Sequence, residues 1–222
     1  MTWIKICGIT NLEDALTAVD AGADALGFVF YEKSPRKIGV ETAREIAKQL
    51  PTSVEKVGVF VGLDASRIEE TVQQAGLTAV QLHGNFSEHF WGNMRSGANW
   101  SGGAKLIAAI PGDLLKGDVL VQFGLPGELF AILVDSRANG VAGGTGTTFD
   151  WEAARGVVTA VSLSVPVIVA GGLTSWNVGE AIRLFQPFGV DVASGVEARP
   201  GKKDPAKIRG FVSAVRAAGK VT

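Results

Sequence analysis

The chain has 222 residues and a formal net charge of −1, with 46% hydrophobic and 19% charged residues, a composition typical of a globular rather than a disordered protein. The near-neutral charge, without a dense block of lysine or arginine, argues against a nucleic-acid-binding surface, and the apolar runs are too short to cross a bilayer. Because the chain has one cysteine, it can form neither an internal disulfide nor a cysteine-cluster metal site, and we expect a cytoplasmic protein without a signal peptide.

Eight short runs of apolar residues predict β-strands. They are WIKIC (3–7), DALGFVF (24–30), VEKVGVF (54–60), TAVQLH (78–83), AKLIAAI (104–110), FAILVDS (130–136), PVIVAGG (166–172) and VDVASG (190–195). Longer amphipathic stretches between them predict helices, and several of these follow a residue type that commonly caps a helix. The predicted caps are Asn11, Asp64, Asp150, Ser175 and Asp204. Left-handed helix ends are predicted at Gly22, Gly76 and Gly219.

Eight alternating strand and helix segments predict a (βα)8 TIM barrel, a parallel eight-stranded barrel with outer helices, formed by residues 1–222 as a single domain. An open, doubly wound parallel sheet is the alternative, and the number of strands favours the barrel. The pattern is weakest in two places. The glycine-rich segment 91–103 is a poor helix end, and residues 111–127 predict a fifth helix that is short or missing.

The alternation of side chains along the first strand places Lys5 and Cys7 on one face and Ile4 and Ile6 on the other. The isoleucines suit the face that packs against helices, so Lys5 and Cys7 should point into the barrel. A buried lysine requires a partner of opposite charge. By the same alternation we expect that partner to be Asp191 on the eighth strand.

Functional groups of such barrels lie at the carboxyl ends of the strands. Cys7 ends the first predicted strand and is followed by a glycine, which favours a functional role over that of a small buried hydrophobic side chain. Asp135 ends an otherwise apolar sixth strand. Burial at the barrel mouth would raise its pKa and allow it to donate a proton, and a helix cap or an ion-pair partner is the alternative role.

Glycine-containing turns follow the last two predicted strands, at Gly171-Gly172 and at Ser194-Gly195. Barrels commonly bind a phosphate on backbone N–H groups at these turns, and glycine lets the backbone approach the anion closely. We therefore expect a phosphorylated small molecule as the ligand. Tight turns without a ligand are the alternative.

Three further candidates lie in loops or at strand ends. The tract AGGTGTT (142–148), which contains Gly143-Gly144, has neither the lysine of a P-loop nor the third glycine of a dinucleotide fingerprint, and we interpret it as a closing loop that adds amides to the phosphate. Arg36 can bind a carboxylate through two hydrogen bonds, although an exposed arginine is more often a solvated charge. His83 is either a hydrogen-bonded supporting residue or a catalyst.

Seven motifs, in the same order from residue 3 to about residue 208, resemble those of the phosphoribosylanthranilate isomerase family of tryptophan biosynthesis. The motifs are KICGIT (5–10), GFVF with SPR (27–36), VGVF (57–60), VQLHG (80–84), LVDS followed by GGTGTTFDW (133–151), AGGL (170–173) and VDVASGVEARPGKKD (190–204). KICG and the pair SGVE and GKKD are the most specific of them.

The resemblance implies a barrel enzyme without metal or cofactor that performs an Amadori rearrangement of N-(5-phosphoribosyl)anthranilate to 1-(o-carboxyphenylamino)-1-deoxyribulose 5-phosphate. It implies Cys7 as general base, Asp135 as general acid and Arg36 as the ligand of the anthranilate carboxylate, with His83 among the substrate-binding candidates. It also places the phosphate near Gly143-Gly144, Gly171-Gly172 and Ser194-Gly195. Ala193 stands where a serine is expected, which leaves the set of phosphate contacts open.

The residue inventory agrees with this chemistry, because opening an aminoaldose ring requires an acid and removing the proton from C2 requires a base. A cysteine is a weak base unless it is the thiolate, and Lys5 could lower its pKa. Three alternative functions remain. Indole-glycerol-phosphate synthase would require lysine and glutamate at several strand ends, and the histidine-pathway isomerase usually has a pair of aspartates. The third alternative is a barrel that binds a phosphorylated ligand without catalysis. A second activity on the histidine-pathway substrate, and the choice between monomer and homodimer, stay open.

Overall fold

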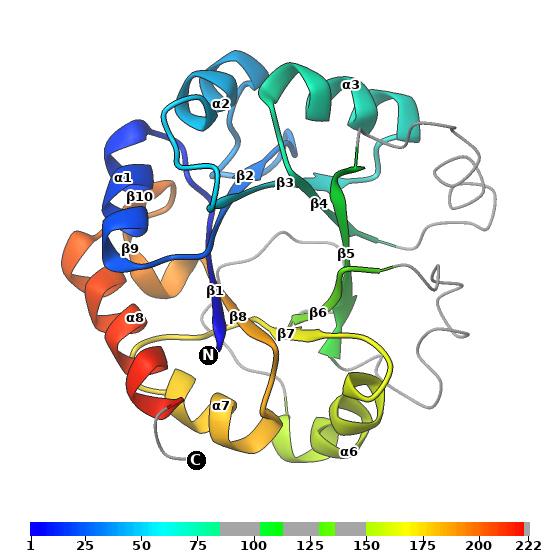
Figure 1. Ribbon diagram of the computed structural model, residues 1–222, viewed down its shortest axis with the longest axis vertical. Coiled ribbons are helices and arrows are strands. Elements are labelled where there is room, and N and C mark those ends of the chain that lie inside the picture. The colour runs from blue at the N-terminus through cyan, green and yellow to red at the C-terminus, as the bar shows by residue number, and fades with distance from the viewer. Residues whose placement is uncertain (85–102, 113–128, 136–149, 220–222) are drawn as a thin grey trace.

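A computed structural model of the chain describes residues 1–84, 103–112, 129–135 and 150–219. Eight parallel strands close into a barrel in chain order, with helices around the outside (Figure 1). The strands are β1 (Trp3–Cys7), β2 (Ala25–Val29), β3 (Glu55–Val61), β4 (Ala79–His83), β5 (Lys105–Pro111), β6 (Ala131–Asp135), β7 (Val167–Val169) and β8 (Gly189–Val192). Because β1 pairs with β8, the sheet has no open edge, so the barrel prediction is confirmed and the open-sheet alternative is wrong.

The outer helices are α1 (Leu12–Ala21), α2 (Val40–Ala47), α3 (Ala65–Ala75), α6 (Trp151–Ser162), α7 (Val178–Phe185) and α8 (Pro205–Ala218). Four of the predicted caps are confirmed, since their side chains accept hydrogen bonds from backbone N–H groups of the first helical turn. These caps are Asn11, Asp64, Asp150 and Asp204. Most of the segments 91–103 and 111–127, including the doubtful fifth helix, lie outside the described residues.

Two predictions at helix ends are wrong. Helix α7 begins after Asn177 and not after Ser175, because the Asn177 side chain accepts a hydrogen bond from the backbone N–H of Thr174 and organises a turn before the helix. Helix α8 ends at Gly219 with a φ of −77°, which is not left-handed. The left-handed ends at Gly22 and Gly76 are confirmed, with φ values of 99° and 66°.

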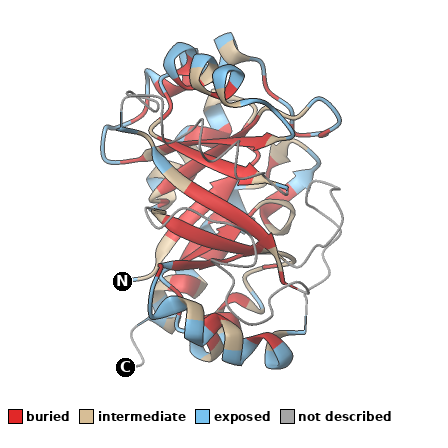
Figure 2. Cartoon of the chain, turned by 90° about the vertical axis from the view of Figure 1, so that its right-hand side faces the viewer, coloured by how far each residue is buried: buried red, intermediate tan, exposed pale blue. Residues whose placement is uncertain are grey.

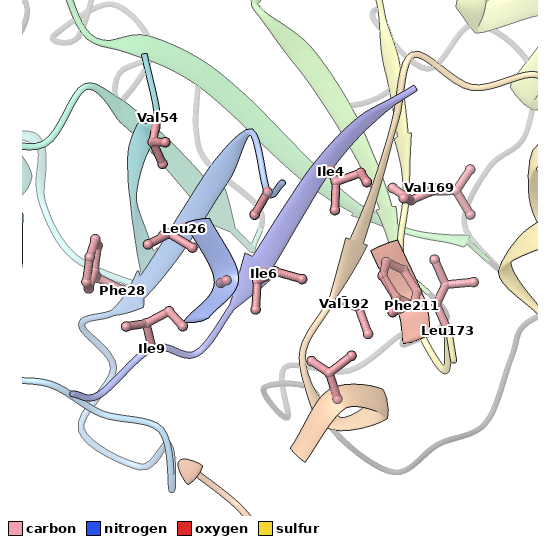
Figure 3. Packing of buried hydrophobic residues seen from close by; sticks show 14 of the residues in the cluster. Ile4, Ile6, Ile9, Leu26, Phe28, Val54, Val169, Leu173, Val192 and Phe211 are labelled. Atoms are coloured by element: carbon pink, nitrogen blue, oxygen red, sulfur yellow. The ribbon is translucent and has the colours of Figure 1, made fainter. Parts of the chain in front are cut away.

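The side chains of the strands divide into an outer and an inner apolar layer. The outer layer lies between strands and helices and includes Ile4 and Ile6 of β1 together with Phe211 of α8 (Figure 3). The inner layer fills the barrel with small and branched side chains such as Ala25 and Ile168. Both layers are nearly sealed from solvent, and exposed residues are concentrated on the outer helices and loops (Figure 2). Because the interior of the barrel is filled with side chains, a ligand-binding site is expected at the strand ends and the loops that follow them.

A short hairpin that the sequence did not predict follows β8. The chain leaves β8 through a 3₁₀ turn at Ser194–Val196 and forms the antiparallel pair β9 (Glu197–Arg199) and β10 (Lys202–Lys203). The hairpin is bound to α1 through Asp14, which accepts hydrogen bonds from the Lys203 backbone and from the Lys202 ammonium. None of the helices in the described part of the chain is long and apolar enough to span a membrane.

Candidate functional site

Cys7 and Asp135 end two parallel strands of the closed barrel, so both lie at the same mouth. Cys7 is on the inner face, where it packs with Val29 and Val59. Asp135 continues the alternation of Leu133, which belongs to the inner layer, and is half-buried. The thiol and the carboxyl are therefore placed by strand geometry on the inner rim of one opening.

Below the thiol lies a buried ion pair. Lys5 and Asp191 are register partners on β1 and β8, and Lys5 Nζ lies 2.8 Å from Asp191 Oδ1. This confirms the pairing predicted from strand alternation. Burial acts to lower the pKa of Lys5, but the charges of Asp191 and Cys7 act the other way and leave the pKa above its ordinary value. Lys5 is thus a fixed cation one pleat below Cys7.

The surroundings of Cys7 give its thiol a raised pKa. Burial is the largest cause, and the nearby charge of Asp191 acts in the same direction, while Lys5 and Lys203 oppose them. The charge of Lys5 thus acts in the direction that favours the thiolate, but burial outweighs it. Room for both side chains comes from Gly27 on β2, where a Cβ would lie 2.7 Å from the Cys7 sulfur and 3.1 Å from Lys5 Cε.

Arg36 is not a solvated surface charge, because only 5% of the residue is exposed. Its guanidinium donates two hydrogen bonds to Glu197, from Nε to Oε1 at 2.8 Å and from Nη2 to Oε2 at 2.7 Å. Its aliphatic part crosses the backbone next to Cys7. A Cβ on Gly8, which has a φ of 79°, would lie 2.6 Å from Arg36 Cδ, so only glycine fits there.

Glu197 and Lys203 are buried residues of this mouth that we did not single out from the sequence. Lys203 Nζ lies 3.1 Å from Glu197 Oε1 and 3.0 Å from the carbonyl oxygen of Ala193. Burial lowers the pKa of Lys203, against the opposing charges of Glu197 and Cys7. The sequence signal for an inward-pointing lysine was the pair of adjacent lysines in GKKD, because neighbouring residues of a β-hairpin point to opposite sides. In the structure, Lys202 forms ion pairs with the acidic residues of α1, and Lys203 points inward.

His83 ends β4 and contacts Gln81, with their Nε2 atoms 2.6 Å apart. Burial, assisted by the charge of Lys5, lowers the pKa of His83 to about 4. The imidazole is therefore neutral near pH 7 and acts there as a hydrogen-bonding group. The buried Oε1 atom of Gln81 has no hydrogen-bond partner within the described parts of the chain.

The turns after β7 and β8 are packed against each other. Gly171 and Gly172 have φ values of 83° and 65°, a backbone region that favours glycine. A Cβ at Gly195 would lie 1.9 Å from the carbonyl oxygen of Leu173, so the turn that begins at Ser194 can approach the β7 loop only because residue 195 is glycine. The structure thus brings together two of the three predicted phosphate turns.

The third predicted phosphate turn, Gly143-Gly144, lies outside the described residues. In the ranges that the structure covers, no group of three or more histidine, cysteine, aspartate or glutamate side chains is arranged to hold a metal ion. The described mouth presents a thiol, a carboxyl, three buried basic side chains and an imidazole that is neutral near pH 7.

Comparison with known proteins identifies a family to which the whole barrel is similar. The model of the family described as N-(5'phosphoribosyl)anthranilate (PRA) isomerase matches residues 4–214. The N-(5'-phosphoribosyl)anthranilate isomerase of Pelobacter propionicus is 43% identical over 96% of this chain and 94% of its own, and that of Geotalea uraniireducens is 45% identical over 96% and 97%. The crystal structure of phosphoribosyl anthranilate isomerase from Thermotoga maritima is 38% identical over 98% of this chain and 100% of its own, with a TM-score of 0.83. A structure of such an isomerase in complex with reduced 1-(o-carboxyphenylamino)-1-deoxyribulose 5-phosphate is also 38% identical, with the same coverage and a TM-score of 0.79.

Proposed function

We propose roles for the mouth residues of a chain that belongs to the N-(5'-phosphoribosyl)anthranilate (PRA) isomerase family. The chain is an isomerase of tryptophan biosynthesis, and its reaction is the Amadori rearrangement of PRA to 1-(o-carboxyphenylamino)-1-deoxyribulose 5-phosphate, an aldose–ketose isomerisation. Membership of this family argues against the alternatives that the sequence left open, namely the two other phosphosugar enzymes and a barrel that binds a phosphorylated ligand without catalysis. The main observation in support of the proposed mechanism is that Cys7 and Asp135 lie at the ends of two strands at the same mouth of the barrel.

In the proposed mechanism Asp135 is the general acid and Cys7 the general base. Asp135 donates a proton to the ring oxygen as the C1–O bond breaks, which leaves a protonated imine (iminium) at C1. Cys7 then removes the proton from C2, and the resulting enol amine becomes the ketone when C1 gains a proton and the C2 hydroxyl loses one. Ring opening needs the acid and removal of the C2 proton needs the base, and such catalysis contributes about 10²- to 10⁴-fold per group.

The base must act as a thiolate, and the structure supplies cations that favour this form. Lys5 and Lys203 both lower the pKa of Cys7, in opposition to burial. Lys5 is held in place by Asp191 and Lys203 by Glu197. We propose that these two fixed cations limit the free energy needed to form the thiolate in the mouth.

The substrate is anionic at both ends, and the proposed contacts fix it at both. Arg36 binds the anthranilate carboxylate through its guanidinium. The phosphate binds backbone amides of the turns after the last three strands, and the packed pair of turns after β7 and β8 supports this assignment. The phosphate residues are Gly143-Gly144, Gly171-Gly172 and Ser194-Gly195. The neutral imidazole of His83 forms a hydrogen bond with the sugar.

Turnover of the variants Cys7→Ser and Asp135→Asn tests the two catalytic roles. Each should lower kcat by about 10²- to 10⁴-fold, while affinity for the reduced product analogue stays near that of the unmodified enzyme. The loss of PRA fluorescence reports turnover on freshly generated substrate. Near-normal kcat in either variant would contradict the role given to that residue.

We further propose that residues 1–222 act as one domain in the cytoplasm, where a reducing environment preserves the single free thiol that the reaction needs. One structural relative is described as monomers generated from a dimeric isomerase of Thermotoga maritima. We propose that this chain works as either a monomer or a homodimer. Light scattering of the purified enzyme at its working concentration distinguishes the two states.

A further inference from the structure

Glu197 receives hydrogen bonds from four residues, which lie in three different segments of the chain. Its Oε1 accepts from Arg36 Nε, from Lys203 Nζ at 3.1 Å and from the backbone N–H of Gly201 at 3.2 Å, and its Oε2 accepts from Arg36 Nη2. Its backbone oxygen accepts from Lys207 Nζ at 2.8 Å. Only 6% of the residue is exposed. Glu197 is therefore the common partner of the β2–α2 loop, the hairpin and α8.

The carboxylate of Glu197 is ionised at neutral pH. Burial acts to raise its pKa, but the hydrogen bonds from Arg36 and the charge of Lys203 hold the pKa below its ordinary value. A charged carboxylate that faces a guanidinium through two parallel hydrogen bonds fixes both the position and the plane of that guanidinium. A single contact to the charge would leave the plane free to rotate.

The guanidinium is fixed at a particular place beside the thiol. The Arg36 side chain lies across Gly8, whose missing Cβ makes room for Arg36 Cδ. The hairpin tip supports the same loop from the other side, because Gly201 packs against the carbonyl oxygen of Pro35 and its own carbonyl oxygen accepts a hydrogen bond from Thr10 Oγ1 at 2.6 Å. Loop and hairpin thus hold Arg36 between the segment that follows Cys7 and Glu197.

We propose that Glu197 is a positioning residue for substrate recognition: it engages the Nε edge of Arg36 and so fixes the orientation in which the guanidinium meets the substrate carboxylate. This inference rests on the proposed role of Arg36. Glu197 does not touch the reacting atoms. It acts by fixing the orientation of Arg36, and through Arg36 it determines the preference for a carboxylate-bearing aglycone over one without a carboxylate.

Two substrates that differ only in this carboxylate test the inference. PRA carries it, and the glycosylamine formed from aniline and ribose 5-phosphate does not. The measured quantity is the ratio of kcat/KM for the two substrates. Glu197→Gln places an amide N–H against a guanidinium N–H and breaks the paired geometry, so the ratio should fall on the order of tenfold, mainly through a higher KM for PRA.

Further variants separate positioning from charge and from general support. Glu197→Asp keeps the charge but is too short for the same geometry, so it should also lower the ratio, and it serves as the test if the glutamine variant does not fold. Arg36→Ala should lower the ratio at least as far, and adding Glu197→Gln to it should change the ratio no further. Asp14→Asn is the matched control, because it loosens the hairpin without contacting Arg36, and it should leave the ratio unchanged.

The possible failures are distinguishable. If Arg36→Ala lowers the ratio but both Glu197 variants keep the value of the unmodified enzyme, the positioning role is wrong and the carboxylate site stands. If Arg36→Ala also keeps that value, Arg36 does not bind the carboxylate and both proposals are wrong. Equal losses for the two substrates in the Glu197 variants would identify a merely structural residue and overturn the inference.

Discussion

Lys5 and Asp191 face each other across the junction of the first and last strands, with Lys5 Nζ 2.8 Å from Asp191 Oδ1 and the lysine side chain fully buried. The pair therefore joins the two strands that close the barrel and also places a cation below Cys7. A buried charge that loses its partner is costly, because the low-dielectric surroundings replace the solvation it would have in water.

Removing the carboxylate should destabilise the barrel. Asp191→Asn leaves the Lys5 ammonium buried without its counter-charge, and the free energy of unfolding should fall by about 3–5 kcal/mol. Urea unfolding followed by circular dichroism measures the change. The control is Glu45→Gln, which breaks the exposed pair between Glu45 and Lys48 and should have little effect, because exposed ion pairs contribute little to stability. Equal effects of the two variants would show that the buried pair is not a stability determinant.

The cation below the thiol should set the pH dependence of activity. The base is active as the thiolate, so kcat/KM rises with pH through the pKa of Cys7. Because Lys5 lowers that pKa, Lys5→Met should raise it and move the ascending limb of the profile to higher pH. Ultraviolet absorbance of the thiolate gives the pKa directly, since Cys7 is the only cysteine. Lys48→Met, at an exposed site, is the control, and an unmoved limb in Lys5→Met would contradict the coupling.

His83 should stay neutral in the folded protein down to about pH 4. Its pKa is lower when folded than when unfolded, so the unfolded chain binds the proton first and stability falls as the pH drops from 6.5 toward about 4. An NMR titration of the imidazole measures the folded pKa, with His83→Gln to assign the signal. The same variant should flatten the pH dependence of the unfolding free energy over this range. A titration near the ordinary histidine value would refute the prediction.

Gly195 should not tolerate a side chain. In Gly195→Ala the new Cβ meets the carbonyl oxygen of Leu173, so the two turns must separate, at a cost of about 1–3 kcal/mol in stability. If these turns hold the phosphate, KM for PRA should rise as well. Gly156→Ala is the control, because this glycine lies inside α6 with nothing within 4 Å of its ideal Cβ, and alanine there should stabilise by about 0.5–1 kcal/mol. Thermal unfolding and steady-state kinetics compare the two, and a neutral Gly195→Ala would contradict the close packing.

Local sequence patterns were sufficient for the strands, most of the helix caps and the face on which each strand residue lies. The pairing of Lys5 with Asp191 followed from these patterns, because alternation along parallel strands is a local property and closure of the barrel then brings the first and last strands together. The caps Asn11 and Asp204 were equally predictable, since each bonds to backbone groups of its own helix. The motifs themselves pointed to the family.

Only the tertiary structure decided how the loops meet and what that does to the charges. Arg36 and Glu197 are 161 residues apart in the chain, and no local period relates a loop residue to a hairpin residue. The net direction of the Cys7 pKa shift likewise depends on whether burial outweighs two cations, one of which, Lys203, comes from that same hairpin. The amino-acid sequence by itself determined the elements and their faces, because periodicity and capping act over a few residues. The electrostatics and close packing of the mouth depend on distances between distant segments, which only the folded chain fixes.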